Sequence, residues 1–199
     1  MKKINFLLAI LFLFGSTLVF TSCTEEEVVE PEFPEVQMFT GKTLTFVTTN
    51  LASSTCMVDA KTGSVIAANG DATKMDIAFA WNSTVGNYSV VSPNAQWIKD
   101  LYSYNNVTYS TTDKKTTSFQ KLSGVDFTTV DAAYVDGMTV TSSTITGGGN
   151  GVQGLATGDL IAFQTADGLK GVIKIGTLAK VTKTLSVDIT VQVEEVAAK

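Results

Sequence analysis

The fold class of this chain is decided by the stretch LIAFQTADGLKGVIKI, residues 160–175. Two apolar runs flank Ala-Asp-Gly at 166–168, and Asp-Gly between apolar runs is the strongest short hairpin signal. Farther along, residues 187–193 alternate strictly between apolar and polar, which predicts a strand with one wet face. Together these segments predict a three-stranded meander over residues 159–194.

Strand signals also dominate the earlier part of the body. The chain predicts a strand at 43–47, and a strand-turn-strand unit from 57 to 67. Residues 76–81 are apolar on both faces from Ile77 on, as expected for a covered central strand. Another strand is expected at 88–91.

Two short helices are expected between these strands. In residues 92–102, Ser92 can cap the helix and Pro93 would occupy its first position. In residues 123–137, the Ser-x-x-Asp spacing resembles a capping box, and Gly137 ends the run. The fold class predicted is mainly β, a β-sandwich or a meander-rich sheet with about two short helices, with α+β as the alternative.

The start of the chain has the parts of an export signal. Lysines at positions 2 and 3 precede an apolar run, residues 6–20, that is shorter than the roughly 20 residues a membrane span needs. Residues 20–23, FTSC, resemble the lipobox of bacterial lipoproteins, with Phe20 in place of the usual leucine. This resemblance implies that the signal peptide 1–22 is removed and that Cys23 is acylated, for example with palmitate, which anchors the protein in a membrane.

The residues after Cys23 are predicted to form a tether. Thr24 to Glu27 resembles the acidic signal that sends Bacteroidetes lipoproteins to the outer face of the outer membrane. Proline and like charge keep such a segment extended. We therefore expect an acidic Pro/Glu tether over 23–38 and one β-rich domain over 39–196. The expected location is the outer membrane, lipid-anchored and exposed at the cell surface.

The amino-acid composition argues against several classes of function. The chain has a net charge of −5, but its 14 basic residues are all lysines, and it has no histidine. Six glutamates lie in the tether, so the body is nearly neutral and nucleic acid is an unfavourable partner. Without histidine there is no Ser-His or Cys-His pair. Cys56 is the only cysteine besides Cys23, and we expect it to be buried.

The motifs that suggest chemistry are weak in context. GNGVQG at 149–154 matches G-x-G-x-x-G, but a strand is expected after it, whereas a dinucleotide site needs a helix there. Paired carboxylates could still serve a glycoside hydrolase, although most of the aspartates fall where capping is expected. We therefore expect no enzyme activity, no cofactor and no metal-ligating residues, with calcium at the aspartate-rich loops as an open alternative. The carboxylate candidates are Asp71, Asp76, Asp126, Asp131 and Asp136.

One aromatic and amide cluster suits a glycan, because flat rings stack on sugar faces and amides bind hydroxyls. The alternative is that Trp97 and Tyr102 form the buried face of a helix. The candidate ligand-contacting residues are Trp97, Tyr102, Tyr104, Tyr109, Asn105 and Asn106.

The body resembles a domain common in Bacteroidetes surface lipoproteins of unassigned function, through segments between residues 62 and 175. The segments are 62–65, 75–80, 91–93, 117–121, 125–127 and 158–175. The resemblance implies no catalytic residues. We expect a non-catalytic binding or surface-interaction module, with a glycan or another envelope protein as its partner. The alternatives are an adhesive subunit that assembles through strand edges, notably 184–193, and, less favoured, the carboxylate-based hydrolase.

Overall fold

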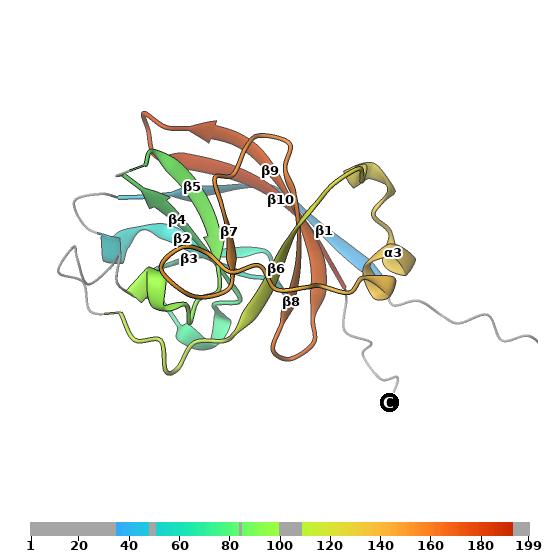
Figure 1. Cartoon of the computed structure of the whole chain (residues 1–199), viewed down its shortest axis with the longest axis horizontal. Coiled ribbons are helices and arrows are strands. Elements are labelled where there is room, and N and C mark those ends of the chain that lie inside the picture. Colours follow the sequence, from blue (N-terminus) through green and yellow to red (C-terminus); the bar gives the residue numbers. More distant parts are fainter. Residues whose placement is uncertain (1–34, 48–50, 84, 100–108, 193–199) are drawn as a thin grey trace, which may run out of the picture. The chain divides into compact units, whose positions relative to one another are not determined.

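The structure, a computed structural model, describes residues 35–47, 51–83, 85–99 and 109–192 (Figure 1). Its strands form one 10-stranded sheet in which every pairing is antiparallel. The strands are β1 (Val36–Thr45), β2 (Thr55–Asp59), β3 (Ser64–Ala67), β4 (Ile77–Asn82), β5 (Asn87–Val91), β6 (Thr117–Leu122), β7 (Gly151–Gln153), β8 (Leu160–Thr165), β9 (Lys170–Ala179) and β10 (Thr184–Gln192). The named helical segments are the 3-10 turns η1 (Leu51–Ser53), η2 (Ala72–Lys74) and η3 (Phe127–Thr129), and the helix α3 (Ala132–Gly137).

The sheet curls until its two end strands nearly meet. Its order is β6-β8-β9-β10-β1-β2-β4-β5-β7, with β3 beside β2. Ser143 bridges the two ends, because its N–H donates to the Phe119 carbonyl (2.9 Å) and its carbonyl accepts from Gly151 N–H (2.8 Å). The prediction of a mainly β fold is confirmed, as a single nearly closed sheet and not as two stacked sheets.

The meander β8-β9-β10 is confirmed, with the hairpin turn at 166–168 as predicted. Strand β4 is buried along nearly its whole length, as expected for a covered strand. The wet face predicted for β10 is only partly wet, because α3 packs against β9 and β10 and Thr190 is fully buried. Strand β1 begins at Val36, so its first residues fall within the segment assigned to the tether.

The first predicted helix begins later than the sequence suggested. Only residues 96–99 of its described part are helical, and Pro93 is not at its first position. A turn comes first, since Ala95 N–H donates to the Ser92 carbonyl at 2.9 Å and Ser92 Oγ donates to Asn94 Oδ1 at 2.6 Å. The serine side chain therefore stabilises this turn instead of capping the helix.

The second helix also starts later, so the predicted capping box was wrong. Asp126 caps only the 3-10 turn η3, with its carboxylate accepting from Thr128 N–H. Asp131 is the N-cap of α3 and accepts from Tyr134 N–H at 2.8 Å, and the helix ends at Gly137 as expected. Among the described residues, no helix is both long and apolar enough to cross a membrane.

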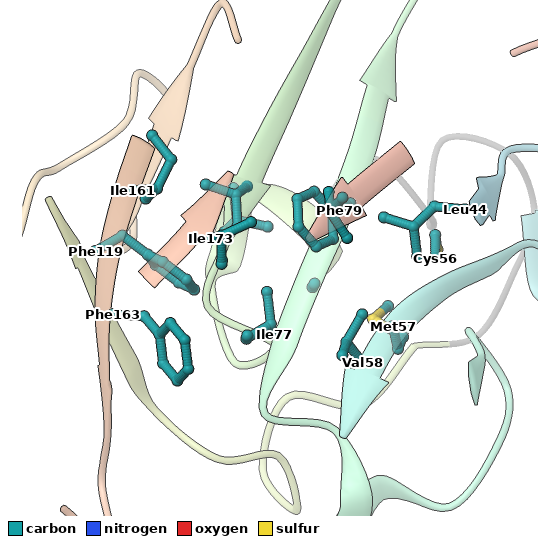
Figure 2. Close-up of a cluster of buried hydrophobic side chains, with 14 of the residues drawn as sticks. Leu44, Cys56, Met57, Val58, Ile77, Phe79, Phe119, Ile161, Phe163 and Ile173 are labelled. Atoms are coloured by element: carbon teal, nitrogen blue, oxygen red, sulfur yellow. The ribbon is translucent and has the colours of Figure 1, made fainter. Parts of the chain in front are cut away.

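Large apolar side chains fill the inside of the closed sheet (Figure 2). Phe119 and Phe163 are paired across β6 and β8, and both are fully buried. Cys56 is also fully buried, as predicted. Each such phenylalanine contributes roughly 1.5–3 kcal/mol by leaving water. Because side chains occupy this interior, a ligand site in the described part of the chain is expected on the outer surface.

Candidate functional site

The six residues predicted to contact a ligand are only partly covered by the structure. Tyr102, Tyr104, Asn105 and Asn106 lie outside the described residues. Trp97 is half-buried and packs against the core.

The sixth residue, Tyr109, is buried, and its hydroxyl donates to the Pro93 carbonyl at 2.8 Å. Burial raises the pKa of Tyr109 well above its usual value. Its position is that of a core packing residue, as expected for most aromatics.

The glycine-rich loop beside Trp97 is a structural turn. Gly147, Gly148 and Gly149 have φ of 98°, 95° and 111°, in the region that favours glycine. A Cβ at Gly147 would lie 2.5 Å from Trp97 Cδ1, so the turn fits closely against the indole ring. Strand β7 follows at Gly151, so no helix begins in the G-x-G-x-x-G segment, as predicted.

A surface pocket of about 430 Å³ lies where α3 and the residues after it meet β6 and β8. Neither Trp97 nor Tyr109 lines it, so it is a different site from the predicted cluster. Its walls combine an aromatic ring, an amide, a hydroxyl, a thioether and small apolar groups. The lining residues are Gln120, Leu122, Ala133, Tyr134, Gly137, Met138, Thr139 and Ala162.

Hydrogen bonds and apolar contacts hold α3 in place over the sheet. Asp131 caps its first turn, and Val135 is fully buried in a second apolar cluster outside the sheet, with Phe127 and Val172. At the other end, Lys170 Nζ from β9 donates to the Asp136 carbonyl at 2.8 Å. A cation near the last carbonyls also suits the helix dipole. These contacts fix the position from which Tyr134 faces the pocket.

Gln120 contributes the amide, and its orientation follows from one hydrogen bond. Thr141 N–H donates to Gln120 Oε1 at 2.8 Å. Since a backbone N–H can only donate, the group facing it must be the oxygen, which settles the usual ambiguity between amide O and N. The –NH₂ group is therefore directed away from Thr141, and no described residue accepts from it.

A second polar cluster lies where the β2–β3 turn and the β8–β9 turn approach the start of β6. Lys115 Nζ is 2.7 Å from Asp76 Oδ1 and 3.7 Å from Asp167 Oδ2. Lys61 Nζ is 3.9 Å from the same Asp167 oxygen. The second Asp76 oxygen accepts from Ala60 N–H at 2.9 Å. The cluster thus joins four segments that are distant in sequence.

Burial decides the electrostatics of this cluster. Asp76 is 1% exposed, and burial raises its pKa although Lys115 and the Ala60 N–H both act to lower it. Burial acts to lower the pKa of Lys115, but the hydrogen bond and charge of Asp76 raise it overall. The raised pKa of Asp76 describes the pair better than the raised pKa of Lys115. Asp76 is buried, whereas the Lys115 side chain is 28% exposed and keeps contact with water. Both Asp76 oxygens are occupied, so the pair holds segments together and offers no unpaired base.

Three of the other four carboxylate candidates perform the capping roles expected of them, whereas Asp136 lies within α3 and caps no helical segment. Asp71, Asp126 and Asp131 each accept from a backbone N–H at the start of a helical segment. Among the described residues, no three histidine, cysteine, aspartate or glutamate side chains gather closely enough to hold a metal ion.

The strand expected to act as an adhesive edge lies inside the sheet. β10 is paired with β9 on one side and with β1 on the other, as far as Gln192. Because both of its edges are occupied by ladder hydrogen bonds, the proposal that 184–193 recruits another strand was wrong for this segment.

The pocket was missed because its residues come from two distant parts of the chain. Tyr134 could be recognised as part of a helix, and Gln120 belongs to a segment that carried the family resemblance but no strand prediction. Only the packing of α3 against the sheet brings the two together.

Comparisons with known proteins find a solved structure whose fold is similar to that of this chain. No protein-family model and no curated protein matches the chain. A solved structure with a similar fold is that of a DUF4466 family protein from Parabacteroides merdae, with a TM-score of 0.56 and 13% sequence identity. The match covers 79% of this chain but 53% of the other, so the chain spans about half the length of that structure. At this identity the similarity concerns the fold alone, which is thus shared with a Bacteroidetes protein family of unassigned function.

Proposed function

We propose that this chain is a lipid-anchored protein of the cell envelope whose body is a non-catalytic module that binds a glycan. The export signal and Cys23 support the anchor, and the acidic residues after Cys23 support exposure on the outer membrane. The pocket beside α3 supports the binding role, and it is the observation on which the ligand class depends.

The pocket combines the groups with which proteins hold sugars. Tyr134 offers a ring for the apolar face of a sugar, and Gln120 and Thr139 offer groups for its hydroxyls. A pocket of about 430 Å³ lies within the usual range for small ligands. Of the residues that the structure describes, no carboxylate lines the pocket, and the Asp131 carboxylate on the same helix is engaged as its N-cap, which favours binding over hydrolysis.

The anchor is tested by feeding cells labelled palmitate and recovering the full-length chain. We expect label on the wild type, loss of label in Cys23→Ser, and retention in the matched control Cys56→Ala. Protease treatment of intact cells should degrade the wild-type body if it faces outward. An unlabelled wild-type chain, or one recovered with the cytosol, would refute the anchor.

The binding role is tested with a glycan array followed by calorimetry on the full-length protein in detergent. Tyr134→Ala should abolish binding of any glycan that the array identifies. Trp97→Ala tests the cluster predicted from sequence and should leave binding intact, with circular dichroism as the check on folding. If the wild type binds no glycan on the array or in calorimetry, the glycan proposal is refuted.

A further inference from the structure

We infer that the pocket beside α3 selects a sugar that carries an N-acetyl group, over plain and acidic sugars. The inference rests on the proposed glycan-binding function and adds to it the chemical group that is read. It follows from three features of the pocket: its lack of charge, the direction of one amide, and the apolar surface around that amide.

The pocket wall carries no charged side chain in the described part of the chain. Lys121, which lies between the lining residues Gln120 and Leu122 in sequence, pairs with Asp159 at 2.7 Å, and Lys170, which reaches α3, donates to the Asp136 carbonyl. A carboxylate or sulfate placed here would lose water without gaining a counter-charge, which is costly. The site therefore suits an uncharged ring.

Gln120 supplies a donor of fixed direction. Its oxygen is held by Thr141 N–H, so its –NH₂ is the group left to a ligand. A sugar hydroxyl can accept from it but can equally accept from water, and it can rotate. An amide carbonyl is a stronger and directional acceptor, and the N-acetyl group of an amino sugar provides one.

Apolar groups share the pocket wall with this donor. Leu122, Met138 and Ala162 line the pocket together with Gln120, and Ala162 is nearly fully buried. Leu122 and Met138 can cover the methyl of an acetyl group and remove it from water. Tyr134 remains available for the face of the ring. The pocket thus matches a carbonyl, a methyl and a ring at the same time.

The test uses methyl NMR of the full-length protein labelled at its methionines. Met138 reports the pocket, while Met57 and Met75 are fully buried and report the fold, and Met38 is 50% exposed and reports non-specific contact. The probes are N-acetylglucosamine, glucose and glucuronate. We expect N-acetylglucosamine to shift the Met138 signal with an affinity at least about 10-fold higher than that of glucose, and glucuronate to leave it unmoved.

Gln120→Glu removes the donor: it keeps an acceptor for Thr141 N–H, replaces –NH₂ with an oxygen and adds a negative charge. It should weaken N-acetylglucosamine binding by about 10-fold or more. Gln120→Met separates the loss of the donor from the added charge. Gln164→Glu makes the same change two residues from Ala162 on β8, outside the pocket, and should leave the affinity unchanged. If Gln120→Glu disturbs the Met57 and Met75 signals, Gln120→Met removes the donor without adding charge and takes its place.

The possible failures are distinguishable. If glucose binds as well as N-acetylglucosamine, or if Gln120→Glu changes nothing, the N-acetyl inference is overturned while glycan binding stands. If no sugar moves Met138 but the array shows a glycan that Tyr134→Ala still binds, the pocket is not the site. If no sugar binds the wild type anywhere, the inference falls together with the proposed function.

Discussion

Replacing Lys115 with methionine tests whether the buried carboxylate of Asp76 depends on its counter-charge. The methionine keeps most of the length of the side chain but removes the ammonium that lies 2.7 Å from Asp76 Oδ1. Ala60 N–H still donates to the other oxygen. Asp76, 1% exposed, would then hold a charge with one hydrogen bond and no ion partner.

Protonation of Asp76 sets an upper limit on the free energy of unfolding that Lys115→Met can lose. Removing one partner of a buried pair costs about 3–5 kcal/mol. The carboxyl group can instead take a proton, which from its ordinary pKa of 3.8 costs about 4 kcal/mol at pH 7, at about 1.4 kcal/mol per pH unit. Since Lys115 is 28% exposed and water reaches its position, we expect a loss of about 2–4 kcal/mol in the free energy of unfolding at pH 7.

The assay is urea unfolding followed by tryptophan fluorescence at pH 7 and at about pH 4. The loss should shrink below about 1 kcal/mol near pH 4, where protonated Asp76 needs no counter-charge. Lys61→Met is the matched control; its Nζ is 3.9 Å from Asp167 and its side chain is 40% exposed, so it should cost less than about 1 kcal/mol. The double variant with Asp76→Asn should recover most of the loss. Equal effects of the two lysine substitutions, or a Lys115→Met loss that is the same at both pH values, would refute the reasoning.

Three further outcomes are expected. Gly171→Ala should destabilise the fold by about 1–3 kcal/mol, because its Cβ would lie 2.3 Å from the Thr190 carbonyl oxygen, whereas Gly137→Ala meets nothing within 4 Å and should be nearly neutral in urea unfolding. Tyr88→Phe should cost about 1 kcal/mol, since the hydroxyl lies 3.0 Å from the carbonyls of both Ala179 and Thr184; an unchanged urea midpoint would contradict this. The raised pKa of Asp76 means that its contribution to stability is complete below pH 3.8 and is lost as the pH rises through the folded pKa, so Asp76→Asn should gain stability relative to wild type between about pH 4 and pH 7; a difference independent of pH would count against it.

The sequence was most informative where local signals agree with the fold. The turn at 166–168 lies between two apolar runs that pair with each other, so the hairpin needed no knowledge of the rest of the chain. The burial of β4 likewise followed from its apolar residues.

The helix starts were missed because Ser92, Asp126 and Asp131 all suit a cap, and a side chain that can cap an α-helix can equally cap a turn. Tertiary packing decides between them: with the helix beginning after Asp131, Val135 is fully buried in the apolar cluster with Phe127 and Val172.

The closure of the sheet and the candidate pocket depend on long-range contacts. Ser143 joins Phe119 to Gly151 through two backbone hydrogen bonds, and a serine at this position does not by itself predict them. The pocket needs Gln120 from β6 beside Tyr134 from α3, a contact that the packing of the apolar cluster around Val135 creates. A single sequence carries no record of such pairings, because each residue is compatible with many partners.

The pairing of β1 with β10 has a consequence for the order in which the sheet forms. Thr45 stands opposite both Thr55 and Thr184, so β1 has one neighbour, β2, close in sequence and another, β10, that is distant. Until β10 pairs with it, one edge of β1 keeps an open row of N–H and C=O groups, and the long loop between the two strands closes slowly. We therefore expect the ladder between β1 and β10 to form late in folding, after the local hairpins such as β8–β9.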